Sequence, residues 1–482
     1  MTRLGALVDG LEGGDAAVEV TGVAIDHRQI VPGALFGAFR GARFNAEDVI
    51  ANVVTAGAVA VIARPEARVE GAVHIRADEP RRVFAMAAAR FFGRAPQTLV
   101  AVTGTNGKTS TVELTRQLWR LTGLVSASIG TLGVTTADEQ VKTGLTTPDI
   151  VTFLSNLSGL ACEGVTHLAF EASSHGLDQY RTEGPHIAAG AFTNLSRDHL
   201  DYHHDMKSYF AAKMRLFDEV VADDGAAVIW TDDAWSDRAT AHARKRGLRL
   251  FTIGSCGADI RLISRIATPL GQALHLDVTG VGERLVNLPL IGAYQAANAL
   301  VAAGLAIATG SDALRVLDAL ARLQPVRGRL ERAGLTRTGA PIYVDYAHTP
   351  DALTAALSAL RPHAKGRLIL VFGAGGDRDA GKRPEMGKAS VQGAEIVIIT
   401  DDNPRGEDAS LIRRAIMAAA PRAREIADRR QAIAAAIAAA QEGDIIIIAG
   451  KGHEQGQIIG CGDEMRIIPF DDAEVARQEA GL

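Results

Sequence analysis

The sequence predicts an α/β protein built from three domains. Apolar runs of four to six residues alternate almost throughout with alanine-rich segments of helical period, a pattern typical of parallel sheets covered by helices. The chain has 482 residues, and division by roughly 150 residues per domain gives about three domains. Junctions with proline and glycine, FGRAPQ and LQPVRGRL, interrupt the pattern near residues 97 and 327. We therefore expect domains at 1–97, 98–326 and 327–482.

The first domain is expected to be a small α/β unit. Its strand candidates lie at 18–25, 58–62 and 73–75, and a helix is predicted at 80–92.

Strand candidates in the other two domains stop at polar residues. In the second domain they are 99–102, 167–170, 188–192 and 226–230. In the third they are 342–345, 368–372, 395–399 and 444–449. We expect a mostly parallel sheet in the central domain and a Rossmann-like arrangement in the C-terminal one. Ligands in such sheets bind beyond the carboxyl ends of the strands.

Composition excludes several classes of function. A net charge of −5 argues against a protein that binds nucleic acid through phosphate contacts. Cys162, Cys256 and Cys461 are far apart, so neither a disulfide framework nor a zinc site is indicated. The longest apolar runs, such as 445–449, have the length of a strand, and no segment resembles a signal peptide. We expect a cytoplasmic protein without membrane insertion.

The most informative motif is TGTNGKT at 103–109, which follows an apolar run and precedes a helical pattern. Backbone N–H groups of such a loop and the positive end of the helix dipole hold phosphate oxygens. Lys108 is then expected to reach the terminal phosphates and Thr109 to bind Mg²⁺. The common loop has a glycine where this chain has Val102, so this is a variant spacing. An ordinary glycine-rich turn between strand and helix is the alternative.

Candidate metal ligands follow two strand candidates of the central domain. Glu171 ends one of them, and an oxygen ligand there suits Mg²⁺ opposite Thr109. The segment TNLSRDHLDYH at 193–203 gathers Asp198 and His199 in one turn region. The alternatives are a solvated or helix-capping Glu171 and an ordinary capped helix start, with Asp198 or Ser196 as the cap.

Lys213 belongs to a predicted helical segment, 206–220, whose apolar positions leave the lysine near a buried face. A lysine that buries its stem and keeps its ammonium in water is the usual explanation.

The third domain carries charged clusters suited to an amino acid with extra charged ends. They are Arg378 with Asp377 and Asp379, then Asp402, Asn403 and Arg405, then Lys451, His453 and Glu454. Guanidinium groups suit carboxylates, and the acidic residues suit ammonium groups. Surface salt bridges among these residues are the alternative.

Taken together, the motifs resemble the Mur ligases, ATP-dependent enzymes that form amides during synthesis of peptidoglycan precursors. The resemblance covers nearly the whole chain and rests on an ordered series: TGTNGKT at 103, TTPD at 146, EASSHGLDQYR at 171, TNLSRDHLDYH at 193, AAK ending at 213, GAYQAAN ending at 298, RGR ending at 329, DYAHTPDAL at 345, GGDRDAGKRP at 375, DNPR at 402 and GKGHE at 450. DNPR matches the signature of the branch that adds diaminopimelate.

The resemblance implies three small-molecule substrates, a UDP-muramoyl-dipeptide ending in D-glutamate, meso-diaminopimelate and ATP, with Mg²⁺ as cofactor. It implies a monomer with a UDP-binding first domain. It implies that the dipeptide carboxylate attacks the γ-phosphate of ATP and that the amine of diaminopimelate then displaces phosphate. Domain closure around hinges near 97 and 327 is expected.

Site residues follow by matching positions. ATP would contact Gly104, Thr105, Asn106, Gly107, Lys108, Thr109, Ser110, Asn298 and Arg329. The UDP substrate would contact Ile25, His27, residues 42–44, Thr146, Thr147, Ser173, Gln179 and Arg181. Diaminopimelate would contact Arg378, Asp402, Asn403, Pro404, Arg405, Gly450 and Glu454. Metal ligands would be Thr109, Glu171, His199 and Lys213, the last as a carbamate (N6-carboxylysine). Lys108, Lys213, His199 and His348 would be catalytic.

This sequence departs from the family at a few positions. His27 stands where members usually carry serine, and Gln295 where they carry asparagine.

Three other functions remain as alternatives. One is a ligase of the same fold that uses lysine or a folate. DNPR argues against lysine, and the first domain argues against a folate. Another is a P-loop ATPase that acts only through conformational change. The third, a dinucleotide-dependent oxidoreductase suggested by GAGGD at 373–377, is weak because the GxGxxG spacing fails.

Overall fold

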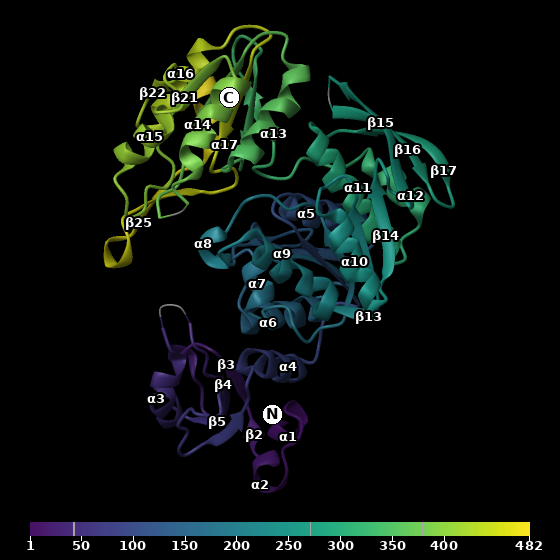
Figure 1. Ribbon diagram of the computed structural model, residues 1–482, viewed down its shortest axis with the longest axis vertical. Helices are drawn as coiled ribbons and strands as arrows, with labels where there is room; N and C mark the ends of the chain where they lie inside the picture. Colours follow the sequence, from purple (N-terminus) through teal and green to yellow (C-terminus); the bar gives the residue numbers. More distant parts are fainter. Residues whose placement is uncertain (42–43, 270, 378) are drawn as a thin grey trace.

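The computed structural model describes residues 1–41, 44–269, 271–377 and 379–482. Three parts follow one another along the long axis of the molecule, from the N-terminal part (purple) through the central part to the C-terminal part (green to yellow) (Figure 1). Each part is built around its own main sheet. The predicted α/β fold class is confirmed.

The N-terminal part holds a parallel sheet of order β3-β4-β5-β6. Its strands are β1 (Thr2–Arg3), β2 (Glu19–Val20), β3 (Gly22–Ala24), β4 (Ala34–Gly37), β5 (Ala58–Ala63) and β6 (Val73–Arg76). Its helices are α1 (Leu4–Leu7), α2 (Gly13–Ala16), η1 (His27–Gln29), η2 (Ala46–Val49), α3 (Ile50–Thr55) and α4 (Pro80–Phe92). Helix α4 has the predicted bounds, because Pro80 suits its first turn and Gly93, at φ 63°, ends it in the left-handed conformation.

The single strand predicted at 18–25 is wrong. Val20 pairs with Thr2 in the small β1–β2 ribbon, whereas Gly22 pairs with Ala34 in the main sheet. Thr21 separates the two pairings, and its hydroxyl donates a hydrogen bond to the Pro32 carbonyl oxygen at 2.6 Å. One continuous apolar pattern therefore serves two different sheets.

The central part contains a large mixed sheet of order β10-β9-β8-β11-β7-β12-β13-β14-β15-β16-β17. Strands β8 to β15 run parallel in this order, and the strands beyond them at both edges are antiparallel. The strands are β7 (Thr98–Thr103), β8 (Ser126–Gly130), β9 (Gly133–Thr135), β10 (Gln140–Val141), β11 (His167–Glu171), β12 (Ile187–Phe192), β13 (Val221–Trp230), β14 (Arg249–Gly254), β15 (Ile260–Thr268), β16 (Gly271–Val278) and β17 (Gly282–Leu288). The helices are α5 (Lys108–Leu121), α6 (Ile150–Cys162), α7 (Ser174–Asp178), α8 (Leu200–His203), α9 (Met206–Arg215), the π-helical η3 (Leu216–Val220), α10 (Ser236–Arg246), α11 (Ala293–Ala308) and α12 (Ala313–Leu320).

Helices cover both faces of this sheet, and β7 lies at its middle. Leu99 and Ala101 of β7 join the core that includes α6, α9 and α10. Val100 and Val102 join the opposite core with α5, α11 and α12. A strand buried on both faces reads as a continuous apolar run, which explains why β7 was recognisable in the sequence.

The C-terminal part has a sheet of order β18-β19-β23-β20-β21-β22 in which β18 is antiparallel and the rest are parallel. The strands are β18 (Glu331–Leu335), β19 (Pro341–Asp345), β20 (Leu368–Phe372), β21 (Ile396–Ile399), β22 (Arg424–Glu425), β23 (Ile445–Ala449) and the separate hairpin β24 (Gly456–Ile459) and β25 (Arg466–Pro469). The helices are α13 (Pro350–Leu360), η4 (Arg361–His363), α14 (Lys382–Gly393), α15 (Ala409–Met417), α16 (Arg429–Ala439), η5 (Gly462–Glu464) and α17 (Asp472–Ala480).

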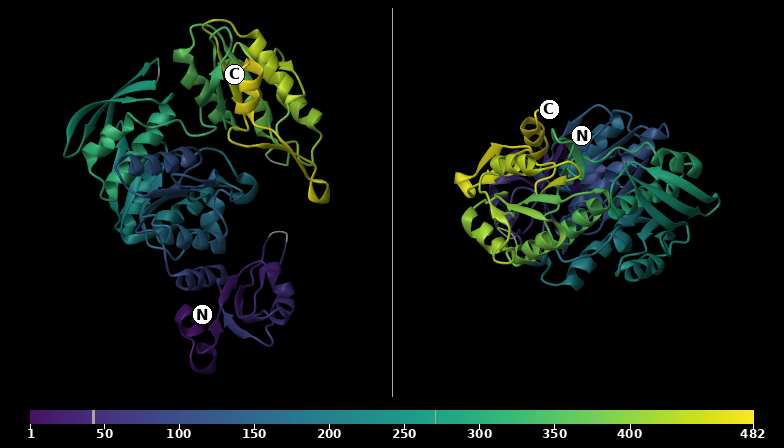
Figure 2. Two further views of the ribbon diagram at one scale, coloured as in Figure 1. Left: turned by 180° about the vertical axis from the view of Figure 1, so that it is seen from behind. Right: turned by 90° about the horizontal axis from the view of Figure 1, so that it is seen from above.

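The three parts are joined in different ways. Helices α4 and α6 pack together, and one hydrophobic core runs from Phe84 of the N-terminal part to Phe153 of the central part. The C-terminal part contacts the central part near the junction, where the Tyr294 hydroxyl donates to Asp345 Oδ2 at 3.4 Å, and also away from it, where Arg197 lies 3.9 Å from Asp379. The left view of Figure 2 shows the N-terminal part below the central part and the C-terminal part above it.

In the part of the chain that the structure describes, no helix combines the length and the apolar character needed to span a bilayer. Cys162, Cys256 and Cys461 are all exposed free thiols.

Candidate functional site

The loop between β7 and α5 has the geometry of a phosphate cradle. Gly104 and Gly107 have φ values of 148° and 87°, which favour glycine. A Cβ on Gly107 would collide with the side-chain oxygen of Asn298 on α11. Asn194, at the end of β12, accepts a hydrogen bond from the Asn106 backbone N–H at 2.9 Å. The loop is therefore fixed from two sides, and α5 begins at Lys108.

A cavity of ≈ 490 Å³ opens beside this loop. Of the predicted ATP contacts, all but Gly104 line it: Thr105, Asn106, Gly107, Lys108, Thr109, Ser110, Asn298 and Arg329. The C-terminal part supplies Asp345, Tyr346 and His348 to the opposite wall. Arg329 reaches across and donates from Nη2 to the Thr109 hydroxyl at 3.0 Å. The cavity therefore lies between the central and C-terminal parts.

Half-buried Lys108 and fully buried Lys213 share one carbonyl oxygen under the loop. Lys108 Nζ donates to the carbonyl oxygens of Gly104 and Thr105, both at 2.9 Å, and Lys213 Nζ donates to the Gly104 oxygen at 2.7 Å. Burial lowers the pKa of Lys213 well below its usual value, and the charge of Lys108 lowers it further. Tyr209 covers Lys213, with the ammonium 4.4 Å from the ring centroid. The whole side chain of Lys213 on α9, including its ammonium group, is therefore buried and does not reach water.

Three of the predicted metal ligands, Thr109, Glu171 and His199, line the cavity. Glu171 is buried, and its Oε1 accepts from the Thr131 backbone N–H at 2.7 Å. Desolvation in the cavity lowers the pKa of His199 despite the opposing charge of Asp198. The N-cap of α8 is His199, at φ 53°, so both alternatives, Asp198 and Ser196, are wrong. Lys213, the fourth predicted ligand, is not among the residues that line the cavity; its Nζ donates to the Gly104 carbonyl oxygen of the loop.

This donor set suits Mg²⁺ held largely by substrate phosphates. Among the described residues, no group of three or more His, Cys, Asp or Glu is arranged to hold a metal by itself. Mg²⁺ usually takes one or two protein carboxylates and completes its shell with phosphate oxygens and water. One carboxylate, one hydroxyl and a neutral imidazole beside a phosphate loop fit that requirement.

The predicted muramoyl-dipeptide contacts form one hydrogen-bonded group next to the cavity. The Thr147 hydroxyl donates to the Glu171 carbonyl at 2.8 Å and lies 2.9 Å from the Ser173 hydroxyl. Arg181 donates to the Thr147 carbonyl at 2.9 Å and to Gln179 Oε1 at 2.7 Å. The remaining member, Thr146, lines the cavity and lies 3.1 Å, hydroxyl to hydroxyl, from Thr131.

The predicted UDP contacts lie apart from this group, on the N-terminal sheet. Ile25 follows β3, and His27 stacks on Phe44 with ring centroids 5.5 Å apart. Residues 42–43 of the predicted 42–44 contact lie outside the described residues.

A second polar site lies at the carboxyl ends of β21 and β23. Buried Asn403 donates to Glu454 Oε2 at 2.7 Å and accepts from the fully buried Lys451 Nζ at 2.9 Å. Arg405 has φ 51°, and its Nη1 donates to the Gly376 carbonyl at 2.9 Å. Gly450 packs so closely on Asp402 that a Cβ would collide with the carboxylate. We call this group the amino-acid pocket: Asp402, Asn403, Pro404, Arg405, Gly450 and Glu454.

Arg378, the remaining residue predicted for the amino-acid pocket, lies outside the described residues.

Aromatic side chains connect the cavity to the amino-acid pocket. Arg329 stacks on Tyr346, with its guanidinium 4.5 Å from the ring centroid. The Tyr346 ring lies 5.1 Å from that of His453, which directly precedes Glu454. His348 lies on the same loop and is held by a 2.8 Å contact from Nδ1 to the Tyr346 carbonyl. Burial and nearby Lys382 lower the pKa of His348, which favours a neutral imidazole in the cavity.

The sequence prediction missed several residues of this region. Asp345 and Tyr346 line the cavity, although only His348 of DYAHTPDAL was assigned. Lys451 was noted as charged but given no role. Arg383 is buried and donates to Glu407 at 2.8 Å. All four residues lie in motifs that were recognised in the sequence, namely DYAH, GKGHE and GKRP. Their position within these motifs is the signal that could have identified them.

The middle strand of the central sheet, β7, leads into a phosphate loop at the N-terminus of α5, and basic side chains converge on one cavity. This arrangement defines a P-loop nucleotide-binding enzyme. Comparison with protein families narrows this class. The family described as "Mur ligase middle domain" matches residues 102–306, and that described as "Mur ligase, glutamate ligase domain" matches residues 328–452.

Individual relatives match over the full length. The UDP-N-acetylmuramoyl-L-alanyl-D-glutamate--2,6-diaminopimelate ligase of Zymomonas mobilis is 56% identical, covering 99% of this chain and 98% of the relative. The enzyme of the same name from Bradyrhizobium diazoefficiens is 52% identical, covering 95% and 94%. A solved structure of a ligase of this name superposes with a TM-score of 0.73 at 32% identity, covering 100% and 99%. The chain belongs to the Mur ligase family.

Proposed function

We propose that this protein is an ATP-dependent ligase that adds meso-2,6-diaminopimelate to UDP-N-acetylmuramoyl-L-alanyl-D-glutamate during peptidoglycan precursor synthesis. Full-length relatives of that name support this assignment. The observation that carries it in the structure is the adjacency of two sites. The cavity beside the phosphate loop and the amino-acid pocket meet through Tyr346 and His453.

The reaction has two steps. An oxygen of the D-glutamate side-chain carboxylate attacks the γ-phosphorus of ATP, forming an acyl phosphate and releasing ADP. The neutral amine of diaminopimelate then attacks the acyl carbon, and the tetrahedral intermediate expels phosphate and loses a proton to give the amide. A free carboxylate is a poor acylating group, so phosphorylation supplies the driving force for the amide step.

The residues of the phosphate loop are proposed to bind ATP and to stabilise the charge that develops during transfer. Lys108 turns inward onto two backbone carbonyls and is positioned to exchange these for phosphate oxygens. Arg329 ends at the Thr109 hydroxyl, where the triphosphate is expected. Positioning and electrostatics of this kind supply most of the catalysis in phosphoryl transfer.

Lys213 is proposed to be carbamylated. Carbamylation joins a neutral amine to CO₂ and releases a proton, so it requires a lysine that loses its charge readily. Burial and the neighbouring Lys108 favour the neutral amine of Lys213. The carbamate would place a buried anion beside Lys108. With Thr109, Glu171 and His199 it would hold Mg²⁺, which would neutralise charge on the triphosphate.

The amino-acid pocket is proposed to select diaminopimelate by charge. Arg405 offers a guanidinium for the second carboxylate that distinguishes diaminopimelate from lysine. Glu454 and Asp402 offer carboxylates for ammonium groups, and Asn403 links the two halves of the pocket.

The remaining assignments are also proposals. Residues 1–97 bind the UDP group, 98–326 bind ATP, and 327–482 bind the amino acid. The protein acts as a monomer in the bacterial cytoplasm, where its nucleotide substrates are found, and binds neither nucleic acid nor membrane.

The test is ADP release from the purified protein with ATP, UDP-muramoyl-dipeptide and one amino acid at a time. We expect turnover that depends on diaminopimelate. If ADP release does not depend on the amino acid, the ligase assignment is wrong and an ATPase that acts through conformational change is favoured. A preference for lysine would contradict the proposed selection by charge.

A further inference from the structure

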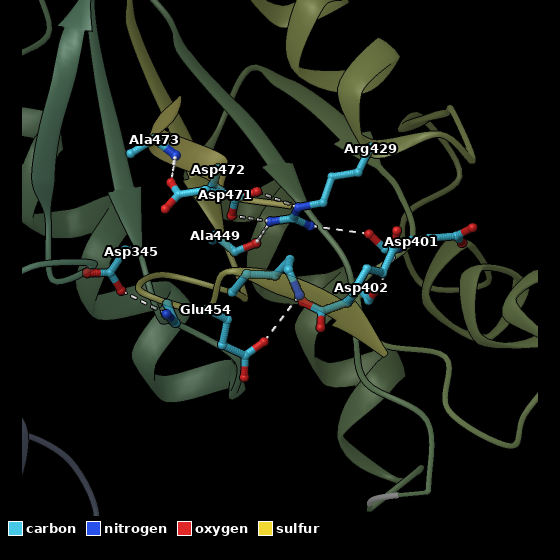
Figure 3. A network of polar contacts seen from close by, with 12 residues as sticks. Asp345, Asp401, Asp402, Arg429, Ala449, Glu454, Asp471, Asp472 and Ala473 are labelled. Atoms are coloured by element: carbon cyan, nitrogen blue, oxygen red, sulfur yellow. Dashed lines mark hydrogen bonds and ion pairs between the residues drawn. The ribbon is translucent and has the colours of Figure 1, made fainter. Parts of the chain in front are cut away.

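A fully buried ion pair lies beneath the amino-acid pocket and has no part in the proposed chemistry. Arg429, the first residue of α16, and Asp472, the first residue of α17, both have side chains that are 0% exposed. Nε and Nη2 of Arg429 each donate to a different oxygen of Asp472 at 2.7 Å. Figure 3 shows this pair with the guanidinium directed toward the strand ends.

The same guanidinium also holds two backbone carbonyls. Nη2 donates to the Ala449 oxygen at 2.9 Å, and Nη1 lies 3.4 Å from the Asp401 oxygen. Ala449 ends β23 directly before Gly450, and Asp401 directly precedes Asp402. One side chain therefore contacts both segments that form the amino-acid pocket (Figure 3).

The sheet itself does not join these two segments. Strand β20 lies between β21 and β23, so no ladder hydrogen bonds connect the strands that lead to Asp402 and Gly450. The distance between the two halves depends on contacts beyond the strand ends. Those contacts include the hydrogen bonds of Asn403 with Glu454 and with Lys451, and the carbonyl contacts of Arg429.

Stability alone is a poor explanation for such a pair. Burying two charges costs several kcal/mol, and replacing a buried ion pair by apolar residues is often neutral or stabilising. We propose that Arg429, oriented by Asp472, is a positioning residue that sets the spacing between the two halves of the amino-acid pocket. This inference rests on the proposed function for the identity of the ligand.

Electrostatics agree with this role. Burial opposes the charge of Arg429, but Asp472, Asp402 and Glu454 together raise the pKa of Arg429 above its usual value. The cation thus stays charged below a pocket that carries two carboxylates.

The test separates positioning from stability with the double variant Arg429→Met/Asp472→Leu. It replaces the pair by apolar residues of similar size and removes both carbonyl contacts. We expect a folded protein whose KM for diaminopimelate rises at least about tenfold, because small misplacements cost this much in a binding site. KM for ATP should change less than about threefold. Arg429→Lys, which keeps the charge but loses the planar fork, should shift KM in the same direction.

A matched control lies at the opposite ends of two of the same strands. Arg367 and Asp444 form an ion pair at the start of β20 and β23, with Nη2 to Oδ2 at 2.6 Å. Arg367→Met should lower the unfolding midpoint without raising KM for diaminopimelate.

Amide hydrogen exchange gives a readout that needs no substrate. In the double variant, peptides covering 402–405 and 450–454 should exchange faster than in the wild type, and the Arg367 variant should leave them unchanged. Wild-type KM and exchange in a folded double variant would overturn the positioning role. If the double variant exchanges faster but ADP release by the wild type does not depend on diaminopimelate, the proposed function is wrong and the positioning role of Arg429 is still supported.

Discussion

At the scale of single residues, the most consequential contact is the carbonyl oxygen of Gly104, which accepts from both Lys108 and Lys213. Two ammonium groups on one buried carbonyl repel each other strongly, because screening by water is weak there. Losing the proton from Lys213 relieves this repulsion. Burial also lowers the pKa of Lys108, but the charges of Glu171 and Asp198 oppose that change.

Replacing Lys213 by alanine should reduce ADP release at least about 100-fold, as expected for loss of a group that organises transition-state charge. If the carbamate is what matters, short carboxylates such as formate should restore part of the activity by filling the space left. Lys207→Ala, an exposed lysine on the same helix, is the control and should keep full activity. Wild-type turnover in the Lys213 variant would remove the carbamate from the mechanism.

Replacing Arg405 by alanine should raise KM for diaminopimelate about 10- to 100-fold, the equivalent of one or two hydrogen bonds to a charged group. KM for ATP should stay near the wild-type value. Steady-state kinetics with each substrate varied in turn measures both constants, and Arg414→Ala on the surface of α15 is the control. Equal increases in both constants would mean that Arg405 only supports the fold of its loop.

Site residues could be predicted from the sequence where they stood in a recognised motif with familiar chemistry. Lys108, Glu171 and Glu454 are of this kind. The burial of Lys213 under Tyr209 and the inward turn of Asp402 depend on which helices and loops pack around them. Arg429 was not predicted, because its two carbonyl contacts come from strands distant in sequence.

At the scale of elements, the phosphate loop allows a clean comparison of two glycines at the ends of α5. Gly107 and Gly123 have similar φ values, 87° and 96°, but a Cβ collides with Asn298 only at Gly107. Alanine at either position should cost about 1 kcal/mol of stability from backbone strain. Only Gly107→Ala should also weaken ATP binding, which calorimetric titration would measure. Equal ATP affinities for the two variants would contradict the role of the loop.

The ion pair of Arg367 and Asp444, at the start of β20 and β23, is expected to make a pH-dependent contribution to the free energy of unfolding. The hydrogen bond from Arg367 lowers the pKa of Asp444 to about 2, whereas an unfolded aspartate titrates near about 3.9. The contribution is therefore complete above the unfolded value and is lost as pH falls toward 2. Asp444→Asn should cost about 1–2 kcal/mol near pH 7, allowing for the partly exposed Arg367.

Denaturant unfolding at pH 7, 5 and 3 would measure this effect. The difference between the wild type and Asp444→Asn should narrow at the lowest pH, whereas exposed Asp318→Asn on α12 should show little difference at any pH. A gap that stays constant from pH 7 to 3 would refute the proposed titration.

Elements were predictable where burial on two faces leaves a continuous apolar run, as in β20, whose bounds match the prediction at 368–372. Mostly exposed strands were not. In β15 only Ile260 is buried, and in β17 only Val286 and Leu288 are buried, so neither strand carries a continuous apolar run. The split of 18–25 into two strands required knowledge of where β1 and β4 lie.

At the scale of the whole molecule, the contacts between parts predict which of them moves. The C-terminal part meets the central part at the junction and through separate polar pairs, such as Arg197 with Asp379 and Lys142 with Gln455. At the junction, Leu330 has a strained φ of 47° and its N–H is held by Asp345. The N-terminal part shares a hydrophobic core with α6. Of the two expected hinges, only that near 327 should move during turnover.

Distance measurements between labelled cysteines test this. In a Cys256→Ser background, labels on Cys162 and Cys461 report on the central and C-terminal parts, and their separation should shorten when ATP and the UDP substrate bind. Replacing Cys461 by serine and Glu12 by cysteine gives a second pair, across the N-terminal junction, whose distance should not change. A change in both pairs would show that residues near 97 also bend.

The shared core between α4 and α6 sets a limit on modular engineering of this chain. A deletion of residues 1–97 would leave an apolar stripe around Phe153 facing water, and the remaining fragment would aggregate even though its phosphate loop is intact. A graft that gives the ligase a different nucleotide-recognition module must therefore bring a helix equivalent to α4. The boundary between reusable units therefore follows the packed interface of α4 and α6 rather than the polar linker that separates the first two sheets.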